Sequence, residues 1–246
     1  MWAYGRYGPG NSIVLYEYDP TRSSEVPKRL LLNYKGYLQA DGYDGYNAVS
    51  SQDDIIRVGC MAHCRRKFVE AYEASVKGQG KAQEALLLIQ SLYKIESEIR
   101  EQTRDQKKQI RSEQSKPILE KFKLWLDRIH NTIPHESVLG KAISYALNEW
   151  KYLVRYIDDG QIEIDNNFIE NQIRPFALGR KNWLFSQSVA GVKASANIYS
   201  IMQTAAANNI ELFSYLKKLM KELPNSQTQA QLEALLPFAD RQLTKK

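Results

Sequence analysis

The segment IDNNFIENQIRPFALGRKNW, residues 164–183, concentrates side chains that could do chemistry. It places the carboxylate of Glu170 shortly before the cations of Arg180 and Lys181, beside an apolar helical stripe. A surface helix uses such charges for solubility. A site that holds a metal ion on one side and a phosphate backbone on the other needs the same combination, so both interpretations are open at this point.

A second carboxylate, Asp41, follows the strand-like run YLQA and precedes Gly42, which predicts that it lies at the end of a strand. Open α/β sheets place their chemistry outside the carboxyl ends of strands. Asp before Gly is also ordinary turn chemistry, and Glu170 three residues after Asn167 is also ordinary helix capping. The residues alone leave both interpretations open for each acid.

If both acids are catalytic, their chemistry is that of hard divalent cations, which prefer carboxylate oxygens. Two such ions, about 3.5–4 Å apart, can clamp the attacking and leaving oxygens of a phosphodiester. A strand end and a helix face can bring two acids to one point. Such sites usually take three or more carboxylates, so this pair is incomplete by itself.

The chain of 246 residues is 43% hydrophobic and 25% charged, an ordinary globular composition for one large domain or two small ones. No apolar run approaches the roughly 20 residues of a membrane span, and no secretory leader is recognisable. Two cysteines fit a reducing cytoplasm. The net charge of +6 suits an anionic partner such as nucleic acid, although many soluble proteins are this basic.

Residues 1–60 predict the order β-β-α-β-β, with Ser24 as the cap of the helix. A helical pattern follows, and its charged stretch EIREQTRDQKKQIRSEQSK favours an exposed helical hairpin over a binding face. The segment RYIDDGQIEIDN predicts strands around an Asp159-Gly160 turn. A further helix is expected from Asn167, ended or kinked by Pro175, and then more helices to the C-terminus.

The motif CMAHC invites a zinc interpretation, because Cys60, His63 and Cys64 are close enough in sequence to share a metal ion. A structural zinc site needs four ligands, and only His130 and His135 remain. Zinc is therefore disfavoured. His63 orienting a carboxylate or a phosphate is the alternative.

Four motifs together, GYLQADGYDGYN, GCMAHCRRKF, IDNNFIENQIRPFALGRKNWLF and IYSIMQTAAANN, make the chain resemble the large transposase subunit of the insertion-sequence-sixty-six family, a DDE-type transposase. The motifs cover nearly the whole chain in the family's order. The resemblance implies an α/β ribonuclease-H-like (retroviral-integrase-like) core with an Asp-Asp-Glu triad. It also implies four parts: residues 1–61 and 156–208 as the two parts of the core, 62–155 as an all-helical insertion, and 209–246 as a C-terminal helical extension.

On this resemblance Asp41 matches the second Asp of the triad and Glu170 matches the Glu, both as ligands of Mg²⁺ or Mn²⁺. The family's first Asp lies in an Asp-Glu-Thr motif on the strand before MWAYGRY, and the chain has no counterpart to it. Asp19 and Asp44 do not substitute for it by position. We therefore expect a chain that lacks the N-terminal part, from a truncated or frameshifted copy or a misplaced start.

The resemblance also gives the basic residues a context. Basic residues near Glu170 are expected to bind DNA phosphates. A second group of basic residues begins the helix in HCRRKF, and it either binds DNA as well or only forms a solvent-exposed face. The expected DNA-binding residues are Arg174, Arg180, Lys181, Asn182, Arg65, Arg66 and Lys67. Trp183 is expected in the core rather than stacked on a base, and Asp165 and Asn166 in turn and cap roles rather than on DNA.

The implied function is that of a transposase, which cleaves DNA and transfers the strand in transposition and recombination. Its partners would be double-stranded DNA, both terminal repeats and target, and further copies of itself or other transposition proteins. Its location would be cytoplasmic, at the nucleoid, with no membrane partner. Without the first Asp, enzyme activity of this chain alone stays open. The alternatives are a catalytically inactive fragment that binds DNA or transposase, and a product without function.

Overall fold

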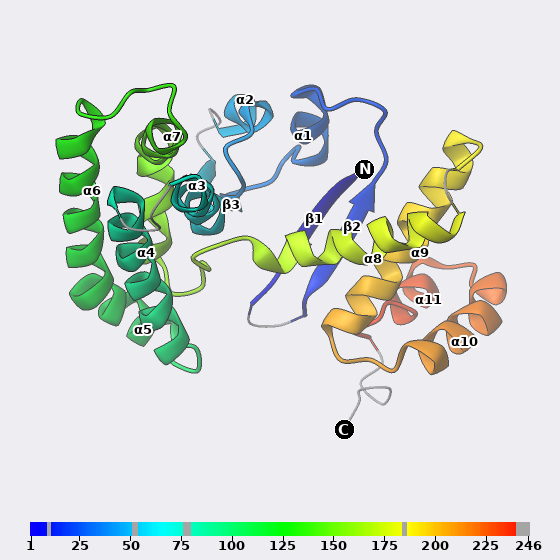
Figure 1. Ribbon diagram of the computed structural model, residues 1–246. Helices are drawn as coiled ribbons and strands as arrows, with labels where there is room; N and C mark the ends of the chain where they lie inside the picture. The colour runs from blue at the N-terminus through cyan, green and yellow to red at the C-terminus, as the bar shows by residue number, and fades with distance from the viewer. Residues whose placement is uncertain (9–10, 51–53, 76–79, 184–185, 240–246) are drawn as a thin grey trace. The chain divides into compact units, whose positions relative to one another are not determined.

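The computed structural model describes residues 1–8, 11–50, 54–75, 80–183 and 186–239, without the side chains of Ser50, Arg180, Asn182 and Trp183. The fold is mixed α/β, mostly helical with two small sheets (Figure 1). Contacts divide the chain into two compact units. Met1–Thr21 with Asn167–Lys246 form the hairpin unit, and Arg22–Asn166 form the bundle unit.

The hairpin unit is built on two antiparallel strands, β1 (Trp2–Arg6) and β2 (Ile13–Glu17). Two long helices, α8 (Asn167–Trp183) and α9 (Val189–Ala207), pack on them. The ring of Tyr16 connects the two helices, because it lies 6.0 Å from the ring of Phe176 on α8 and 6.2 Å from that of Tyr199 on α9. Alternating aromatic and β-branched residues favour the strands.

Helix α9 completes the hydrogen bonding of β2 with polar side chains spaced one helical turn apart. They bond every second residue along β2 and just before it: Ser200 with Tyr16, Thr204 with Val14, and Asn208, just after the helix, with Ser12. Val14 and Tyr16 stand opposite Gly5 and Ala3 in the register, and they turn their N–H groups to α9 instead of to β1. By the same alternation, the backbone groups of Ala3 and Gly5 point away from β2, and no backbone hydrogen bond reaches them within the described residues.

The C-terminal end of the hairpin unit is a small helical cluster. It contains α10 (Leu212–Glu222), the short helix η4 (Leu223–Asn225) and α11 (Gln229–Ala234). Tyr215 is buried in its core and donates a hydrogen bond to the carbonyl of Leu235 at 2.8 Å. The helices predicted after residue 209 are thus present.

The bundle unit begins with α1 (Glu25–Leu30) and the parallel strands β3 (Gly36–Gln39) and β4 (Ile55–Val58). Between the strands lie two short helices that were not predicted, η1 (Asp44–Tyr46) and α2 (Asn47–Ser50). The predicted order β-β-α-β-β over the first 60 residues is confirmed. Ser24 occupies the N-cap position of α1 but makes no side-chain capping bond.

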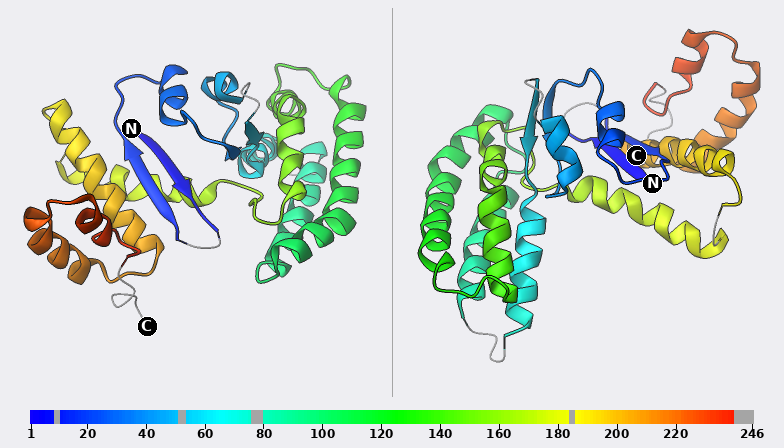
Figure 2. Two further views of the ribbon diagram at one scale, coloured as in Figure 1. Left: turned by 180° about the vertical axis from the view of Figure 1, so that it is seen from behind. Right: turned by 90° about the horizontal axis from the view of Figure 1, so that it is seen from above.

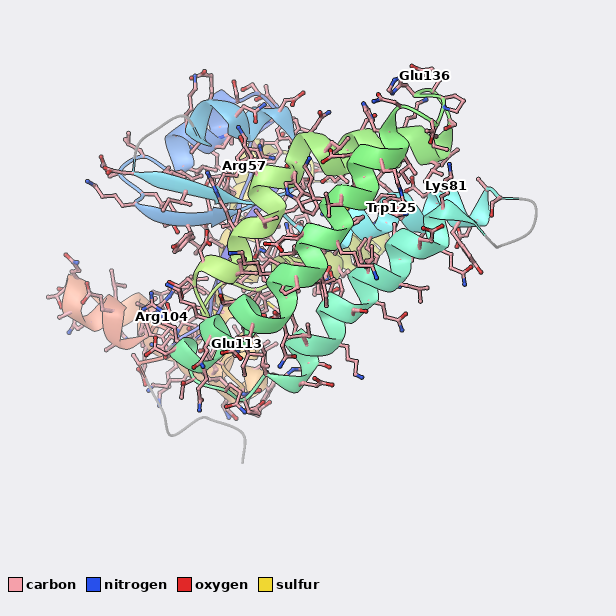
Figure 3. All side chains as sticks on the ribbon, turned by 90° about the vertical axis from the view of Figure 1, so that its left-hand side faces the viewer. Arg57, Lys81, Arg104, Glu113, Trp125 and Glu136 are labelled. Atoms are coloured by element: carbon pink, nitrogen blue, oxygen red, sulfur yellow. The ribbon has the colours of Figure 1, made fainter. Side chains whose placement is uncertain are left out.

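The rest of the bundle unit is helical. Its elements are α3 (Met61–Glu73), α4 (Lys81–Glu98), α5 (Arg104–Ile110), the π-helical turn η2 (Arg111–Ser115), α6 (Lys116–His130), α7 (Val138–Leu153) and η3 (Val154–Asp158). Helices α4, α6 and α7 run side by side in both views of Figure 2. Their core holds the rings of Phe68, Phe122 and Trp125, each about 6 Å from the next, and Trp125 lies inside the bundle in Figure 3.

One prediction about the chain before α8 was wrong. The segment around Asp159 and Gly160 forms η3 and an irregular stretch, with no strand among its described residues. Ile162 and Ile164 are buried and Glu163 is exposed, so the alternating pattern is real, but the segment anchors by single bonds such as Met61 N–H to the Ile164 carbonyl instead of a ladder. Alternation of apolar and polar residues shows that one side of the segment is buried, and this can occur without pairing to another strand.

Of the two effects predicted for Pro175, an end of the helix is excluded, because α8 continues to Trp183, and a kink stays a prediction. A proline inside a helix leaves the carbonyl four residues earlier without its usual donor. That residue is Asn171, which is exposed, so water can satisfy its carbonyl. The four-part domain division stays a prediction.

Candidate active site

Asp41 lies just beyond β3, and the ladder between the strands extends almost to it, because Ala40 N–H donates to the Val58 carbonyl at 3.0 Å. Its predicted position at the carboxyl end of a strand is confirmed. The side chain is half-buried, and its Oδ1 accepts a hydrogen bond from Tyr43 N–H at 3.2 Å. This bond forms an Asx turn, so the turn chemistry weighed from the sequence is also present. Its role as a metal ligand stays a prediction.

The main chain at Asp41 is held by Arg57 of β4, which is 2% exposed. Arg57 Nη2 donates to the carbonyl oxygen of Asp41 at 2.9 Å and to Glu149 Oε2 at 2.7 Å. Its Nη1 donates to Asn47 Oδ1 at 3.0 Å, and the guanidinium lies 4.2 Å from the ring centre of Tyr152. Figure 3 labels Arg57 where the strands meet the helical bundle. One cation therefore ties the Asp41 turn to α2 and α7.

Glu149 supplies the negative charge of this arrangement from α7. Burial raises the pKa of Glu149, Arg57 opposes the rise, and the charges of Asp41 and Asp44 add to it. Gly42 brings α7 close to the turn, because a Cβ atom there would lie 2.9 Å from a ring carbon of Tyr145. The site is thus a turn pressed against a helix that carries a buried carboxylate.

Sequence reasoning missed Arg57 and Glu149, although both leave a signal. Arg57 interrupts the apolar run IIRVGC, where a charge has no place on a solvated face. Glu149 falls on the apolar stripe of α7, between the buried residues Ala146 and Leu153. When a cationic and an anionic side chain both fall at positions predicted to be buried, they are expected to form a buried ion pair.

Helix α8 begins at Asn167 as predicted and carries Glu170 in its first turn, half-buried. Its first turn is fixed on the hairpin, since the ring of Phe168 stacks on that of Tyr7 at 4.4 Å. A Cβ atom on Gly5 would lie 2.7 Å from Ile169 Cδ1, so the absence of a side chain at Gly5 lets Ile169 pack against the strand. Glu170 belongs to the hairpin unit and Asp41 to the bundle unit, and their convergence stays a prediction.

Comparison with known proteins identifies the family. Residues 1–194 match the model of the Transposase IS66 family, and residues 200–238 match the IS66 C-terminal element. The chain belongs to the IS66 transposase family. The resemblance inferred from the four motifs is therefore confirmed.

Relatives of this IS66 family member occur in Sinorhizobium fredii (strain NBRC 101917 / NGR234). The uncharacterized protein y4jD is 33% identical over 238 residues, covering 94% of this chain and 46% of the relative. The uncharacterized protein y4qI is 31% identical over 253 residues, covering 97% and 46%. The chain thus spans about half the length of the curated relatives it matches. No solved structure matches the chain. Among the described residues, no helix is long and apolar enough to cross a membrane.

The basic residues expected to bind DNA in this IS66 protein are exposed wherever their side chains are described. Arg174 and Lys181 are exposed on α8, and the side chains of Arg180 and Asn182 lie outside the described residues, as does that of Trp183. On α3, Arg65, Arg66 and Lys67 are all exposed, and Lys67 lies 3.6 Å from Glu70. Exposure is compatible with both DNA contact and a solvated face, so these assignments stay predictions.

The cysteines of CMAHC and Asp165 lie in or next to the core of the bundle unit. Cys60 and Cys64 are fully buried, and burial raises the pKa of Cys60 to about 11 despite an opposing backbone hydrogen bond from Asn166. Burial raises the pKa of Cys64 as well. Buried thiols with a raised pKa are protonated at neutral pH unless a metal ion displaces the proton, so core packing and zinc binding both stay open. Asp165 accepts a hydrogen bond from Tyr93 Oη at 2.7 Å, which anchors the segment before α8 on α4.

Proposed function

We propose that this chain is the larger part of the catalytic core of an IS66-family transposase, with a ribonuclease-H-like fold and an Asp-Asp-Glu mechanism of DNA cleavage and strand transfer. The observation that carries the proposal is Asp41. In a chain of this family, it is a half-buried carboxylate at the end of a parallel strand, with its main chain locked by a buried arginine. That is the placement expected of a group that must hold a ligand in fixed geometry.

In this proposal Asp41 and Glu170 are ligands of Mg²⁺ or Mn²⁺. The donor set fits hard cations, because carboxylate oxygens are their preferred ligands and both side chains are solvent-accessible. A bound divalent ion would supply Lewis-acid activation of water and charge stabilisation at the scissile phosphate. The contribution of the chain is to hold Asp41 by the β3–β4 pair and Glu170 by the packing of α8 on the hairpin.

The first Asp of the triad would come from a strand N-terminal to Met1 in the longer protein. Support for this comes from β1, whose outward-facing backbone groups at Ala3 and Gly5 have no backbone partner among the described residues. An edge of this kind accepts another strand. In the ribonuclease-H-like order, the strand with the first Asp would pair with β1 at this edge.

The exposed cations Arg65, Arg66, Lys67, Arg174 and Lys181 would position the DNA through its phosphates. They lie on two different helices, α3 and α8. Double-stranded DNA, as terminal repeats and as target, is therefore the proposed partner. Self-association and other transposition proteins belong to the same proposal.

The test is Mg²⁺-dependent cleavage of terminal-repeat DNA by three proteins: this chain, the chain extended to the length of its relatives, and the extended chain with Asp41→Asn. We expect cleavage by the extended chain only, with the fold and DNA binding of the Asp41→Asn variant retained. Cleavage that survives Asp41→Asn would rule out Asp41 as a ligand.

A second candidate function is that of a catalytically inactive fragment that binds DNA or full-length transposase. It is favoured by the exposed cations of α3 and α8, which could bind DNA phosphates without cleavage. Robust cleavage by the 246-residue chain itself would exclude it, and would show that another acid completes the site.

A further inference from the structure

We propose that Arg57 and Glu149 act together as positioning residues for Asp41. Arg57 fixes the main chain of the Asp41 turn, and Glu149 cancels the charge of Arg57, so that the site keeps its affinity for a cation. This inference rests on the proposed role of Asp41 as a metal ligand and extends it to a residue pair that the motifs do not contain.

Arg57 contacts the main-chain oxygen of Asp41 and not its carboxylate. The guanidinium donates to the carbonyl of Asp41 at 2.9 Å, while the one described hydrogen bond to the Asp41 carboxylate comes from Tyr43 N–H. An arginine on the carboxylate would occupy the oxygens that a metal ion needs. An arginine on the carbonyl holds the turn and leaves those oxygens accessible.

Glu149 offsets the charge that Arg57 brings to the site. A buried guanidinium beside a divalent-cation site would repel the ion, because the interaction of two charges is strong where water is excluded. Glu149 lies 2.7 Å from Arg57 Nη2 and is 13% exposed, so the pair is close to neutral as a unit. The charge of Asp41 contributes to the raised pKa of Glu149, in agreement with their nearness.

Arg111, the other deeply buried arginine of the bundle unit, has a different set of partners. Arg111 bonds Glu96 through Nε and Nη2 and the carbonyls of Tyr156 and Asp159 through Nη1, so all these partners lie in the helical part of the unit. Arg57 reaches across to the candidate site, and its Nε has no partner among the described residues. Stability alone would favour the fuller set of bonds.

The experiment measures Mn²⁺ binding to the extended chain, from the loss of the free Mn²⁺ electron paramagnetic resonance signal. Glu149→Gln keeps the shape of the side chain and leaves Arg57 uncompensated. Arg57→Lys keeps the charge and loses the forked geometry. We expect each to weaken Mn²⁺ binding about 10- to 100-fold, the range seen when residues that orient metal ligands are changed. Far-UV circular dichroism verifies that each variant is folded.

Two further variants separate positioning from stability. Glu96→Gln is the matched control, since it removes the same charge from the pair with Arg111, and should leave Mn²⁺ affinity unchanged. Arg57→Met with Glu149→Leu replaces the pair by apolar side chains of similar size, a change that often preserves stability. We expect this folded double variant to bind Mn²⁺ as weakly as Arg57→Lys.

The outcomes distinguish the positioning role from the function on which it rests. If Asp41→Asn leaves Mn²⁺ binding intact, or if the extended chain binds no Mn²⁺, the proposed function itself fails. If Asp41→Asn abolishes binding while Glu149→Gln, Arg57→Lys and the double variant bind normally, only the positioning role is overturned. An equal loss in Glu96→Gln would also overturn it, because the effect would then be one of stability.

Discussion

The two units satisfy their leftover backbone groups with different chemistry. In the bundle unit, arginines donate to carbonyls: Arg57 to Asp41, Arg111 to Tyr156 and Asp159, and Arg155 to Arg57 itself. In the hairpin unit, neutral side chains of α9 and the residue after it bond the outer edge of β2. The hydroxyl of Thr204 both accepts and donates a hydrogen bond, since it accepts from Val14 N–H and donates to the Val14 carbonyl, both at 3.0 Å.

The difference follows from what each backbone segment presents. A strand edge presents N–H and C=O groups together. Thr204 and Asn208 both accept from this edge and donate to it, while Ser200 only accepts. The bundle unit presents carbonyls at turns and helix ends, where a side chain with donors alone suffices. A buried arginine then needs a carboxylate, so the bundle unit acquires charge pairs and dependence on pH, while the hairpin ladder stays neutral.

The largest expected effect tests the buried arginine bonds of the bundle unit. Arg111 is 1% exposed, and Arg111→Met leaves Glu96 without its partner. It also removes one donor each from the carbonyls of Tyr156 and Asp159, and the Asp159 carbonyl keeps Ile162 N–H. We expect a loss of about 3–5 kcal/mol in the free energy of unfolding, measured by urea denaturation. Adding Glu96→Leu should recover only part, because the bonds from Arg111 to the two carbonyls remain lost. Full recovery would show that the carbonyl bonds contribute nothing.

The matched control for this prediction is Lys123→Ala. Lys123 pairs with Asp127 at 2.6 Å on the exposed face of α6. An exposed pair of this kind is worth less than about 1 kcal/mol.

The second effect tests the hydrogen bonds between the uncharged side chains of α9 and the backbone of β2. Thr204→Val keeps the shape of the side chain but leaves both backbone groups of Val14 unpaired in a buried position. We expect a loss of about 1–3 kcal/mol, measured by urea denaturation. Thr132→Val, at an exposed threonine, should stay within about 0.5 kcal/mol of the unaltered chain. Equal effects of the two substitutions would contradict the role of the ladder.

A third prediction concerns pH. Burial alone would raise the pKa of Asp159, but hydrogen bonds from the Arg104 guanidinium and from Gln161 N–H outweigh it and hold this pKa below the usual range. A lowered pKa contributes stability above the unfolded value, near 3.9, and this stability is lost as pH falls below it. Asp159→Asn should therefore flatten the fall in melting temperature between about pH 4 and pH 2.

The pH experiment also has an internal contrast. The pKa of Glu149 is raised, so its contribution decreases as pH rises and opposes that of Asp159. The Ser200, Thr204 and Asn208 side chains do not titrate, and Thr204→Val should cost the same at about pH 4 and pH 7. If the loss of stability in Thr204→Val changed with pH, the stability of the hairpin unit would also depend on titrating groups.

The smallest expected effect concerns cations that stay exposed in both units. If Arg65 and Lys181 bind DNA phosphates, Arg65→Ala and Lys181→Ala should each reduce the salt slope of DNA binding by about 0.9 for every phosphate that is no longer neutralised. The measurement is DNA affinity as a function of salt concentration. An unchanged slope for either variant assigns that residue to the solvated surface.

Several features of this protein were determined by the sequence itself. The order of strands and helices over the first 60 residues, the place of Asp41 at a strand end and the start of α8 at Asn167 all follow from short-range patterns. Local period, glycine positions and capping residues act over a few residues, so they can be recognised without knowing the rest of the fold. The four family motifs, which are also read from the sequence alone, predicted that the chain belongs to the IS66 family.

The contacts that hold the candidate site were decided by tertiary structure alone. Arg57 and Glu149 are 92 positions apart, and Val14 and Thr204 are 190 apart. The sequence shows a charge at an apolar position, but its partner depends on which helix packs there. Ile162 and Ile164 alternate like a strand yet make no ladder, because alternation records burial while pairing requires a neighbouring edge. Burial of a charge or of a backbone group is tolerable only with its partner, and only the fold supplies that partner.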